Sequence, residues 1–232
     1  MKNNTKFEDL AKIDYKKAWD YQDEIFKELV DIKLFNRDHL LEAKELTNRL
    51  LFCEHNHVYT LGKSGTQNNL LINEQFLNTI SATFYKIDRG GDITYHGEGQ
   101  ITGYPIFDLD ALGLSIREYI FNLEEAIILT LADYGIEGSR LDGSTGVWLD
   151  VNNGNTRKIC AIGVKASRGI SMHGFALNVN TDLTYFNHIN PCGFVDKGVT
   201  SMAKELKAPQ DFELVKINLK EKLERVFNLS FI

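Results

Sequence analysis

The sequence of 232 residues is poor in cysteine and proline, with three of each, and it has no long apolar run. A membrane span needs about 18 or more apolar residues in a row, so we expect no contact with a membrane. The first residues lack the apolar segment and small-residue cleavage site of a secretory signal peptide. Three cysteines do not make a disulfide framework, and their positions match no zinc-binding spacing. We therefore expect a soluble, cytoplasmic protein with free thiols and no metal site.

Basic residues are in the minority, because 26 Lys and Arg stand against 32 Asp and Glu, for a net charge of −6. Proteins that bind nucleic acid usually carry a basic surface, so this balance argues against such a partner. The sequence has no internal repeat, low-complexity tract or linker rich in proline and serine. Its hydrophobic fraction of 43% is ordinary for globular proteins, and we predict one domain over residues 1–232.

Three segments have the apolar spacing of amphipathic helices. The second is the best marked, since Ser115 and Glu118 form a capping-box pattern and Gly135 is a stop signal. The third begins near Asp211. We expect their buried faces to consist of Ala18, Tyr21, Ile25, Leu29 and Ile32, then Ile116, Ile120, Leu123, Ile127 and Leu131, and finally Val215, Leu219, Leu223 and Val226.

Short runs rich in β-branched and aromatic residues predict strands between these helices. An Asn-Gly pair at 153–154 lies between two such runs and predicts a hairpin. Helices before, among and after clusters of strands, without strict alternation, favour an α+β fold, a mixed α/β sandwich. The predicted strands are Arg49–Glu54, Val58–Leu61, Phe84–Asp88, Ile101–Phe107, Gly146–Val151, Arg157–Lys165, Ile170–His173 and Phe175–Val179.

The segment from Asp88 to Gln100 has the composition of a ligand-binding loop, with four glycines, one arginine and one histidine. Glycine lets the backbone approach a ligand closely. Arg89 could neutralise a phosphate or carboxylate, and His96 could donate a hydrogen bond or act in acid–base chemistry. The segment matches neither a P-loop nor a dinucleotide fingerprint, and an elaborate turn without a ligand is the alternative.

Two further segments contain residues capable of chemistry. Lys158 precedes an apolar strand interrupted by Gly163, and it is either a solvated strand end or a cation beside a nucleophile. Cys192 lies between a proline and a glycine, which predicts a tight loop and an accessible thiol. Cys53 and Cys160 lie within apolar runs and are expected to be buried and structural.

Taken in this order, the segments resemble the lipoyl (octanoyl) transferase family, the LipB-type enzymes. The resemblance covers residues 15–225 and implies a catalytic domain like that of biotin and lipoate-protein ligases, with mixed sheets flanked by helices. The motifs that carry it are Glu54-His55, Val58 to Gly62, Arg89 to Gln100, Tyr104 to Ile106, Gly146 to Trp148, Lys158 to Gly163, His173 to Asn178, Pro191-Cys192-Gly193 and Thr200-Ser201.

The resemblance implies an octanoyltransferase that moves the octanoyl group from octanoyl-acyl carrier protein to the target lysine of lipoyl domains. The acceptors would be the E2 subunits of 2-oxoacid dehydrogenases and the glycine cleavage H protein. This would be the first step of endogenous protein lipoylation. The donor acyl group is carried on the phosphopantetheine of the carrier protein, so no cofactor of the enzyme itself is expected. The resemblance also implies a monomer.

By the same resemblance, Cys192 forms an acyl-thioester intermediate and Lys158 lowers the pKa of its thiol. A thiol accepts an acyl group from a thioester at nearly equal energy, so the group stays activated for transfer to an amine. The implied substrate-binding residues are Arg89, Gly90, Gly91, Asp92, Ile93, Thr94, Tyr95, His96, Ala161, Ile162, Gly163, Gly174, Phe175 and Ala176.

The sequence departs from the family pattern at Glu98, where the family usually has proline, and in a longer, more charged segment between Ile32 and Arg49. Two related activities remain open: an ATP-dependent lipoate- or biotin-protein ligase, and an amidotransferase that moves octanoyl groups between protein lysines. A non-catalytic binding protein and a cysteine hydrolase are more distant alternatives. The pairing of Lys158 with Cys192 favours the transferase over the ligase and the binding protein, whereas the amidotransferase is distinguished only by an assay of the donor.

Overall fold

The computed structural model describes residues 3–190 and 197–232. Cys192, the predicted nucleophile, lies outside the described residues. The α-helices are α1 (Tyr15–Asp38), α2 (Glu74–Thr79), α3 (Ile116–Ala132), α4 (Met202–Leu206) and α5 (Phe212–Phe227). Short 3-10 helices are η1 (Leu40–Glu42), η2 (Gln67–Asn69) and η3 (Leu183–His188). In the part of the chain that the structure describes, no helix is both long enough and apolar enough to cross a membrane.

The strands of the described residues form two sheets. Their bounds are β1 (Asn3–Lys12), β2 (Asn48–Glu54), β3 (Val58–Leu61), β4 (Thr83–Lys86), β5 (Ile93–His96), β6 (Gln100–Ile106), β7 (Ser139–Leu141), β8 (Ser144–Leu149), β9 (Arg157–Ser167), β10 (Ile170–Asn178), β11 (Gly198–Val199) and β12 (Leu229–Phe231). The large sheet has the order β12-β1-β2-β6-β10-β9-β8-β7, with β11 also paired to β9. The small sheet has the order β4-β3-β5.

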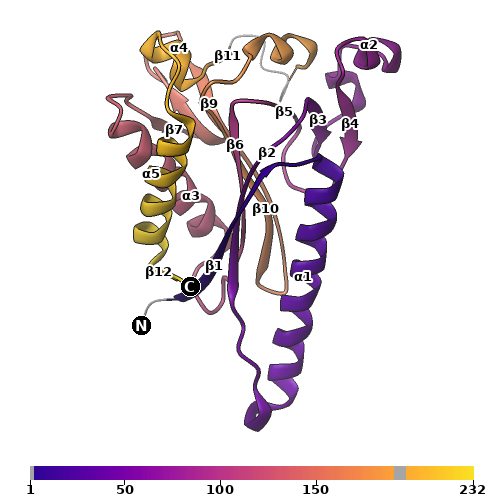
Figure 1. Cartoon of the computed structure of the whole chain (residues 1–232), viewed down its shortest axis with the longest axis vertical. Helices are drawn as coiled ribbons and strands as arrows, with labels where there is room; N and C mark the ends of the chain where they lie inside the picture. The colour runs from indigo at the N-terminus through magenta and orange to yellow at the C-terminus, as the bar shows by residue number, and fades with distance from the viewer. Residues whose placement is uncertain (1–2, 191–196) are drawn as a thin grey trace.

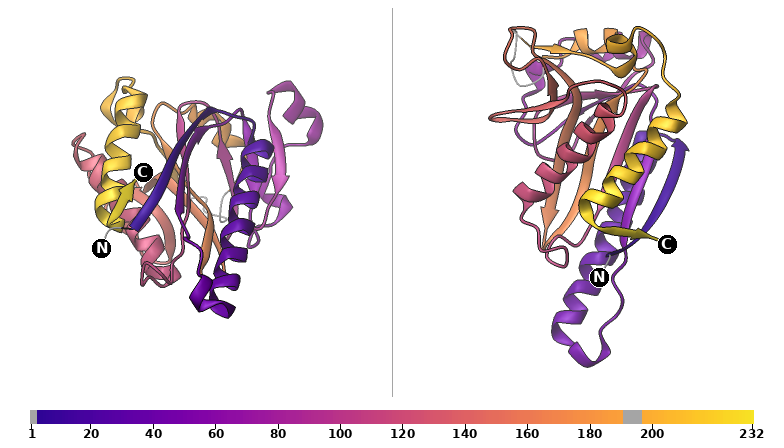
Figure 2. Two further views of the ribbon diagram at one scale, coloured as in Figure 1. Left: turned by 60° about the horizontal axis from the view of Figure 1, so that its bottom comes forward. Right: turned by 90° about the vertical axis from the view of Figure 1, so that its left-hand side faces the viewer.

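The helices cover both faces of the large sheet, as Figure 1 and the right-hand view of Figure 2 show. On one face, Ala18, Ile25 and Leu29 of α1 pack in one cluster with Leu51 and Met172. On the other face, α3 and α5 pack beside each other against the sheet and form the larger core. The predicted α+β sandwich of mixed sheets flanked by helices is therefore confirmed.

The start of α3 follows the capping pattern read from the sequence. The Ser115 hydroxyl accepts a hydrogen bond from the Glu118 backbone N–H at 3.3 Å, and the Glu118 carboxylate accepts one from the Ser115 N–H at 2.8 Å. Two N–H groups that the first turn leaves without helical partners are satisfied in this way. The hydrogen bonds from Ser115 also hold the pKa of the Glu118 carboxyl below its usual value.

The predicted hairpin around Asn153-Gly154 is confirmed, because β8 and β9 pair in the antiparallel direction on either side of it. The two runs predicted at 170–179 form one strand, β10. The segment predicted as a glycine-rich loop contains the strand β5. Charged or short strands were missed by the sequence analysis, namely β1, β7, β11 and β12.

The predicted helical faces are correct except at their margins. Ile116, expected in the core, is 42% exposed because it starts the first turn of α3, on the outer side of the helix. Tyr119 and Ala126 are fully buried in its place. At the end of α5, Phe227 is buried while Val226 is only partly buried, so the apolar face is turned by one residue there.

The capping box gives a direct test of how α3 is stabilised. Replacing Ser115 by alanine removes the side-chain acceptor of the Glu118 N–H, and we expect the free energy of unfolding to fall by about 1 kcal/mol. Urea unfolding followed by far-ultraviolet circular dichroism measures this change. Ser64→Ala, at an exposed loop position, is the matched control and should change stability by less than about 0.5 kcal/mol. Equal stability of the two variants would contradict the capping role.

Candidate active site

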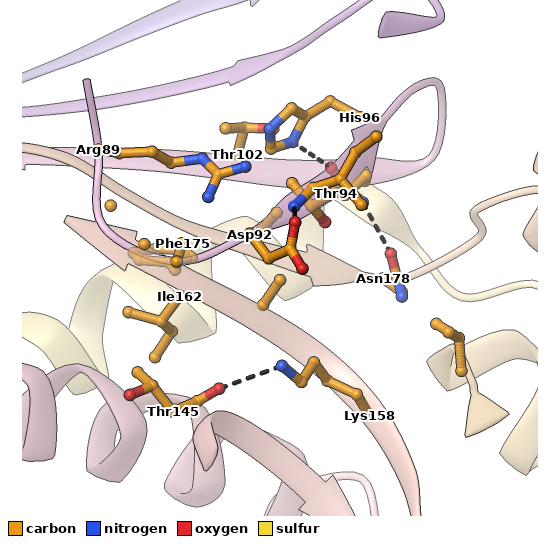
Figure 3. A pocket seen from close by; sticks show the side chains of 18 of the residues that line it. Arg89, Asp92, Thr94, His96, Thr102, Thr145, Lys158, Ile162, Phe175 and Asn178 are labelled. Carbon is orange, nitrogen blue, oxygen red and sulfur yellow. Dashed lines mark hydrogen bonds between the residues drawn. The ribbon is translucent and has the colours of Figure 1, made fainter. Parts of the chain in front are cut away.

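A cavity of about 320 Å³ lies where the small sheet and the loop before β5 meet the large sheet. Residues of β5, β6, β8, β9 and β10 line it, together with residues 197–199 beside β9. Figure 3 shows Arg89 and His96 on one side of the cavity and Lys158 with Thr145 on the opposite side. Ile162 and Phe175, which lie between Arg89 and Thr145 in this view, contribute apolar surface to the lining.

The floor of the cavity is a strip of small residues on neighbouring strands. Thr102 of β6 is paired with Ala176 of β10, and Ala176 is paired with Ala161 of β9. Gly174 and Gly163 face each other one step further along the same two strands. Since alternate residues of a strand point to the same face, the small side chains at these positions leave a trough.

The loop before β5 lies so close to the floor of the cavity that residue 163 must be glycine. A Cβ atom there would meet both the Arg89 Cδ atom and the Gly90 carbonyl oxygen at 3.0 Å. The Gly90 N–H also donates to the Val164 carbonyl at 2.9 Å, which ties the loop to β9. The end of the trough is therefore closed by backbone and by the stem of Arg89.

Arg89 is almost completely buried and binds the protein's own backbone. Its Nη2 atom donates to the Thr60 carbonyl at 2.7 Å and to the Thr60 hydroxyl at 2.9 Å, and Nη1 donates to the Gly90 carbonyl at 2.9 Å. Thr60 belongs to β3, so the guanidinium joins the loop to the small sheet.

His96 lies in a chain of hydrogen bonds that fixes its tautomer. Its Nδ1–H donates to Gln100 Oε1 at 2.9 Å, while Gln100 Nε2 donates to Asn178 Oδ1 at 2.8 Å. Asn178 in turn donates to the Thr200 carbonyl. Burial lowers the pKa of His96 to about 3, so the ring is neutral at pH 7 and its Nε2 atom is a hydrogen-bond acceptor.

His173 lies on the large-sheet side of the cavity and has a positive φ of 63°. Its Nε2 atom is 3.0 Å from Asp88 Oδ1, and Lys165 Nζ is 2.6 Å from the other oxygen of that carboxylate. Hydrogen bonds from His173 and Lys165 hold the pKa of Asp88 well below its usual value. Burial lowers the pKa of His173 as well.

Lys158 points into the cavity at the start of β9. Its Nζ atom donates to the Thr145 carbonyl at 3.1 Å and lies 4.4 Å from the centre of the Trp148 ring. An ammonium over an aromatic face is stabilised by the negative potential of the ring. The Lys158 ammonium therefore forms one end of the cavity, and the neighbouring strand β8 holds it in place.

The two described cysteines are free and buried, and neither is among the residues that line the cavity. Burial raises the pKa of both Cys53 and Cys160, so neither is a thiolate at pH 7. This agrees with the prediction that both are structural. The prediction for Cys192 concerns a residue outside the described part of the chain.

The structure brings most of the predicted binding residues to the cavity. Gly90 and Tyr95 do not line it: the Gly90 N–H donates to the Val164 carbonyl, and the Tyr95 hydroxyl is 2.7 Å from His57 Nδ1. The predicted residues that do line it are Arg89, Gly91, Asp92, Ile93, Thr94, His96, Lys158, Ala161, Ile162, Gly163, Gly174, Phe175 and Ala176.

Several lining residues were not predicted as site residues, chiefly Tyr15, Thr102, Tyr104, Thr145, Trp148, His173, Asn178 and Phe186. Tyr15 and Phe186 come from elements with no recognisable motif, whereas Trp148 and His173 lie within motifs noted in the sequence. Thr102 Oγ1 is buried, and within residues 3–190 and 197–232 it has no hydrogen-bond partner. The same residues contain no cluster of three His, Cys, Asp or Glu side chains suited to a metal ion.

The fold is that of the catalytic domains of enzymes that attach lipoate or biotin to proteins. A bi-partite lipoate protein ligase from Thermoplasma acidophilum superposes on all of this chain and 86% of its own with a TM-score of 0.69 at 13% identity. A biotin protein ligase from Aquifex aeolicus covers 96% of this chain and 70% of its own with a TM-score of 0.52 at 11% identity. At such identities the likeness concerns the fold alone.

Sequence comparison places the chain within one family. The lipoyl protein ligase A/B catalytic domain matches residues 14–224, and the chain belongs to this family. An octanoyltransferase of Parabacteroides distasonis is 54% identical over 96% of this chain and 98% of its own length. The octanoyltransferase of Flavobacterium johnsoniae is 52% identical over the full length of both chains. The resemblance read from the motifs is confirmed.

The neutral, buried His96 predicts a dependence of stability on pH. Its pKa is about 3 in the folded protein against 6.5 in its usual state, so between these values the unfolded chain binds the extra proton. Stability then increases with pH over this window and is lost as the pH falls below about 6.5. From pH 7 to pH 5 we expect His96 to account for a loss of about 2 kcal/mol.

This contribution can be isolated with His96→Asn, which cannot titrate in this range. Guanidinium unfolding at pH 5, 6 and 7 should give a shallower slope of stability against pH for this variant than for the unmodified protein. His39→Asn, at the exposed end of α1, should leave the slope unchanged. The same slope in all three proteins would be inconsistent with a neutral His96.

Proposed function

We propose that this protein is an octanoyltransferase that moves an octanoyl group from octanoyl-acyl carrier protein to the target lysine of lipoyl domains. Membership of the family and the high identity to octanoyltransferases over the whole chain support the activity. The structural observation that carries the proposal is the trough of small residues that leads to Lys158. An uncharged acyl chain needs such a trough to bind in. The thioester at the end of the chain needs a nucleophile that attacks it and a cation that activates this nucleophile.

The dimensions of the trough suit a medium-length acyl chain. Gly163 follows Lys158 after five steps along β9, which corresponds to at most about 16 Å of extended strand. Ala161, Ala176, Gly163 and Gly174 leave the space over the sheet, and Phe175 and Ile162 contribute apolar surface. The loop with Arg89 closes the far end. The acyl chain would lie along β9 with its carbonyl carbon near Lys158.

Cys192 would accept the octanoyl group as a thioester. Its thiolate attacks the carbonyl carbon of the donor thioester, a carbon–sulfur bond forms, and the bond to the phosphopantetheine sulfur breaks. The leaving thiolate takes up the proton of the Lys158 ammonium, which leaves Lys158 as a neutral amine, and departs as a thiol with the carrier protein. The ammonium of Lys158 would lower the pKa of the Cys192 thiol, because a nearby positive charge favours the thiolate.

The chain on both sides of this cysteine supports its assignment to the cavity. Phe186 on the N-terminal side and residues 197–199 on the C-terminal side line the cavity. Val199 is paired with Lys158 in β11 and β9, and the Thr200 N–H donates to the Lys158 carbonyl at 2.9 Å.

In the second half of the reaction, the amine of the acceptor lysine attacks the acyl-enzyme. An amide bond forms, the carbon–sulfur bond to Cys192 breaks, and the thiolate is regenerated. The attacking amine must lose a proton, and a neutral Lys158 amine would take it as general base. The ammonium and thiolate of the starting state are thereby restored.

The partners follow from this reaction. The donor is the acyl carrier protein, and the acceptors are the apo lipoyl domains of E2 subunits of 2-oxoacid dehydrogenases and the glycine cleavage H protein. Both half-reactions proceed with side chains of the protein and the phosphopantetheine of the donor. The proposal therefore includes a monomeric cytoplasmic enzyme without a metal or cofactor of its own, and without nucleic-acid or membrane partners.

Capture of the acyl group is the first test. After mixing with octanoyl-acyl carrier protein, intact-mass spectrometry should show one added octanoyl group on the unmodified protein and on Cys160→Ala. Cys192→Ser should stay at its original mass. Addition of an apo lipoyl domain should then move the group to that domain. An octanoyl adduct on Cys192→Ser would refute the nucleophile assignment.

The same assay separates the transferase from related activities. Octanoylation of the lipoyl domain that requires free octanoate and ATP, and does not occur with the carrier protein, would identify a ligase instead. An octanoylated protein lysine that serves as the donor in place of the carrier protein would identify an amidotransferase. Octanoate released to water as the main product would indicate a hydrolase.

The role of Lys158 can be tested through the reactivity of the thiol. At pH 7 we expect Lys158→Ala to slow alkylation by iodoacetamide, by about tenfold for each unit by which the pKa of Cys192 rises. Above about pH 9.5 both proteins should react at similar rates, since both thiols are then ionised. Cys192→Ser gives the background rate, which should be low because Cys53 and Cys160 are buried with raised pKa values. An unchanged rate at pH 7 would remove this role from Lys158.

A further inference from the structure

Lys158 lies next to an irregularity in the pairing of β9 with β8. Val147 is paired with Cys160 and the next residue, Trp148, is paired with Lys158, so Ile159 is an extra residue on β9. Such a bulge locally twists a strand and changes the direction of the neighbouring side chains, and bulges are common beside active sites. Ile159 is fully buried, whereas Lys158 faces the cavity.

Three residues of β8 surround the side chain of Lys158, and we call them the lysine cradle: Thr145, Gly146 and Trp148. The Thr145 carbonyl accepts the hydrogen bond from Nζ at 3.1 Å, and the Trp148 ring lies 4.4 Å from Nζ. Gly146 has a φ of +119°, and a Cβ atom there would be 2.5 Å from the Cys160 carbonyl and 3.4 Å from Lys158 Cε. Only glycine lets β8 pass this close to the stem of the lysine.

The indole of Trp148 is held in a fixed orientation. Its Nε1–H donates to the Ser144 carbonyl at 2.9 Å, and the side chain is 2% exposed. The face of the ring is thus presented to Lys158 independently of any substrate. A carbonyl oxygen and an aromatic face both interact better with an ammonium than with a neutral amine.

A buried carboxylate of α3, that of Glu124, binds the backbone of the lysine cradle. Glu124 Oε1 accepts a hydrogen bond from the Gly146 N–H at 2.9 Å, and Oε2 is 3.1 Å from Arg140 Nε. Burial raises the pKa of Glu124, while the Gly146 hydrogen bond and the charges of Arg140 and Lys158 act in the opposite direction. The mechanism proposed above makes no chemical use of Glu124, yet it anchors the backbone on which Thr145 and Gly146 lie.

We propose that Trp148 and Glu124 are positioning residues for the transfer reaction: the Trp148 ring holds the Lys158 ammonium at the end of the cavity, and Glu124 fixes the β8 backbone that carries the cradle. This inference rests on the proposed function, in which Lys158 activates Cys192. It adds that contacts with β8 and α3 fix the position of Lys158 and favour its ammonium form before substrate binds.

The contribution of the ring can be tested without changing its shape. The sequence has two tryptophans, so a Trp19→Phe background leaves Trp148 as the single site for biosynthetic incorporation of fluorinated tryptophans. Fluorine withdraws electron density from the ring face and weakens its attraction for a cation. We expect the alkylation of Cys192 by iodoacetamide at pH 7 to slow progressively with the number of fluorines, by about fivefold over the series.

The same proteins should show a split between kinetic constants. In octanoyl transfer we expect kcat to fall with fluorination, while KM for octanoyl-acyl carrier protein stays within about twofold, because the ring acts through Lys158. Thermal unfolding should remain that of the unfluorinated protein. An alkylation rate at pH 7 that does not change, or that increases, with fluorination would overturn the role of Trp148.

Glu124 is tested with a pair of variants. Glu124→Gln keeps an oxygen for the Gly146 N–H and should retain most of the alkylation rate, whereas Glu124→Leu removes the acceptor and should lose several-fold. Equal rates in both variants would overturn the positioning role. If the unmodified protein failed to capture octanoyl groups from the carrier protein, the proposed function would fall, but the alkylation profiles would still report on the cradle.

Discussion

The buried guanidinium of Arg89 is the contact on which the candidate site depends. It joins the loop before β5 to the Thr60 backbone of the small sheet, while Gly90 in the same loop binds the Val164 carbonyl of the large sheet. A buried charge is costly unless it is well hydrogen-bonded, and here backbone carbonyls supply those bonds. The two sheets are thereby held at the distance that leaves a cavity between them. Arg89, which also lines the cavity, thus helps to define its end through these hydrogen bonds.

The floor of the cavity places a complementary constraint on the large sheet. Ala161, Gly163, Gly174 and Ala176 occupy facing positions on β9 and β10, and a Cβ atom on Gly163 would meet Arg89 and its loop. A Cβ atom on Gly174 would overlap the Gly103 carbonyl oxygen, so glycine there lets β10 lie close to β6. On the opposite face of the same strands, Cys160 and Leu177 are fully buried in the core. The alternation of β9 and β10 thus places Cys160 and Leu177 in the core and Ala161 and Ala176 at the cavity. Ile162 and Phe175 belong to the core cluster and also line the cavity.

Local signals in the sequence predicted the elements whose start or turn is chemically marked. The capping box of Ser115 and the Asn-Gly turn at 153–154 are of this kind, because a few adjacent residues determine them. The strands β1, which is largely polar, and β12, which has three residues, were missed because they are stabilised by pairing with distant residues, as Thr5 is with Asn48 and Phe231. The motifs likewise predicted the lining of the cavity as runs of consecutive residues. Because side chains alternate along a strand, Tyr95 points away from the cavity. A motif gives the region of a site, and only the pairing of strands shows which side chains face it.

The strand β9 combines the two requirements of a transferase in separate halves. From Cys160 to Ser167 it pairs regularly with β10, and this regularity provides the even row of small residues that an acyl chain can follow. At Lys158 and Ile159 its pairing with β8 is interrupted by the bulge, and this irregularity directs the ammonium toward the cavity and against the Trp148 ring. A regular strand would alternate strictly, so Lys158 would share the face of the buried Cys160. In the proposed transfer, the same strand would bind the acyl chain where it is regular and would place Lys158 where it is not.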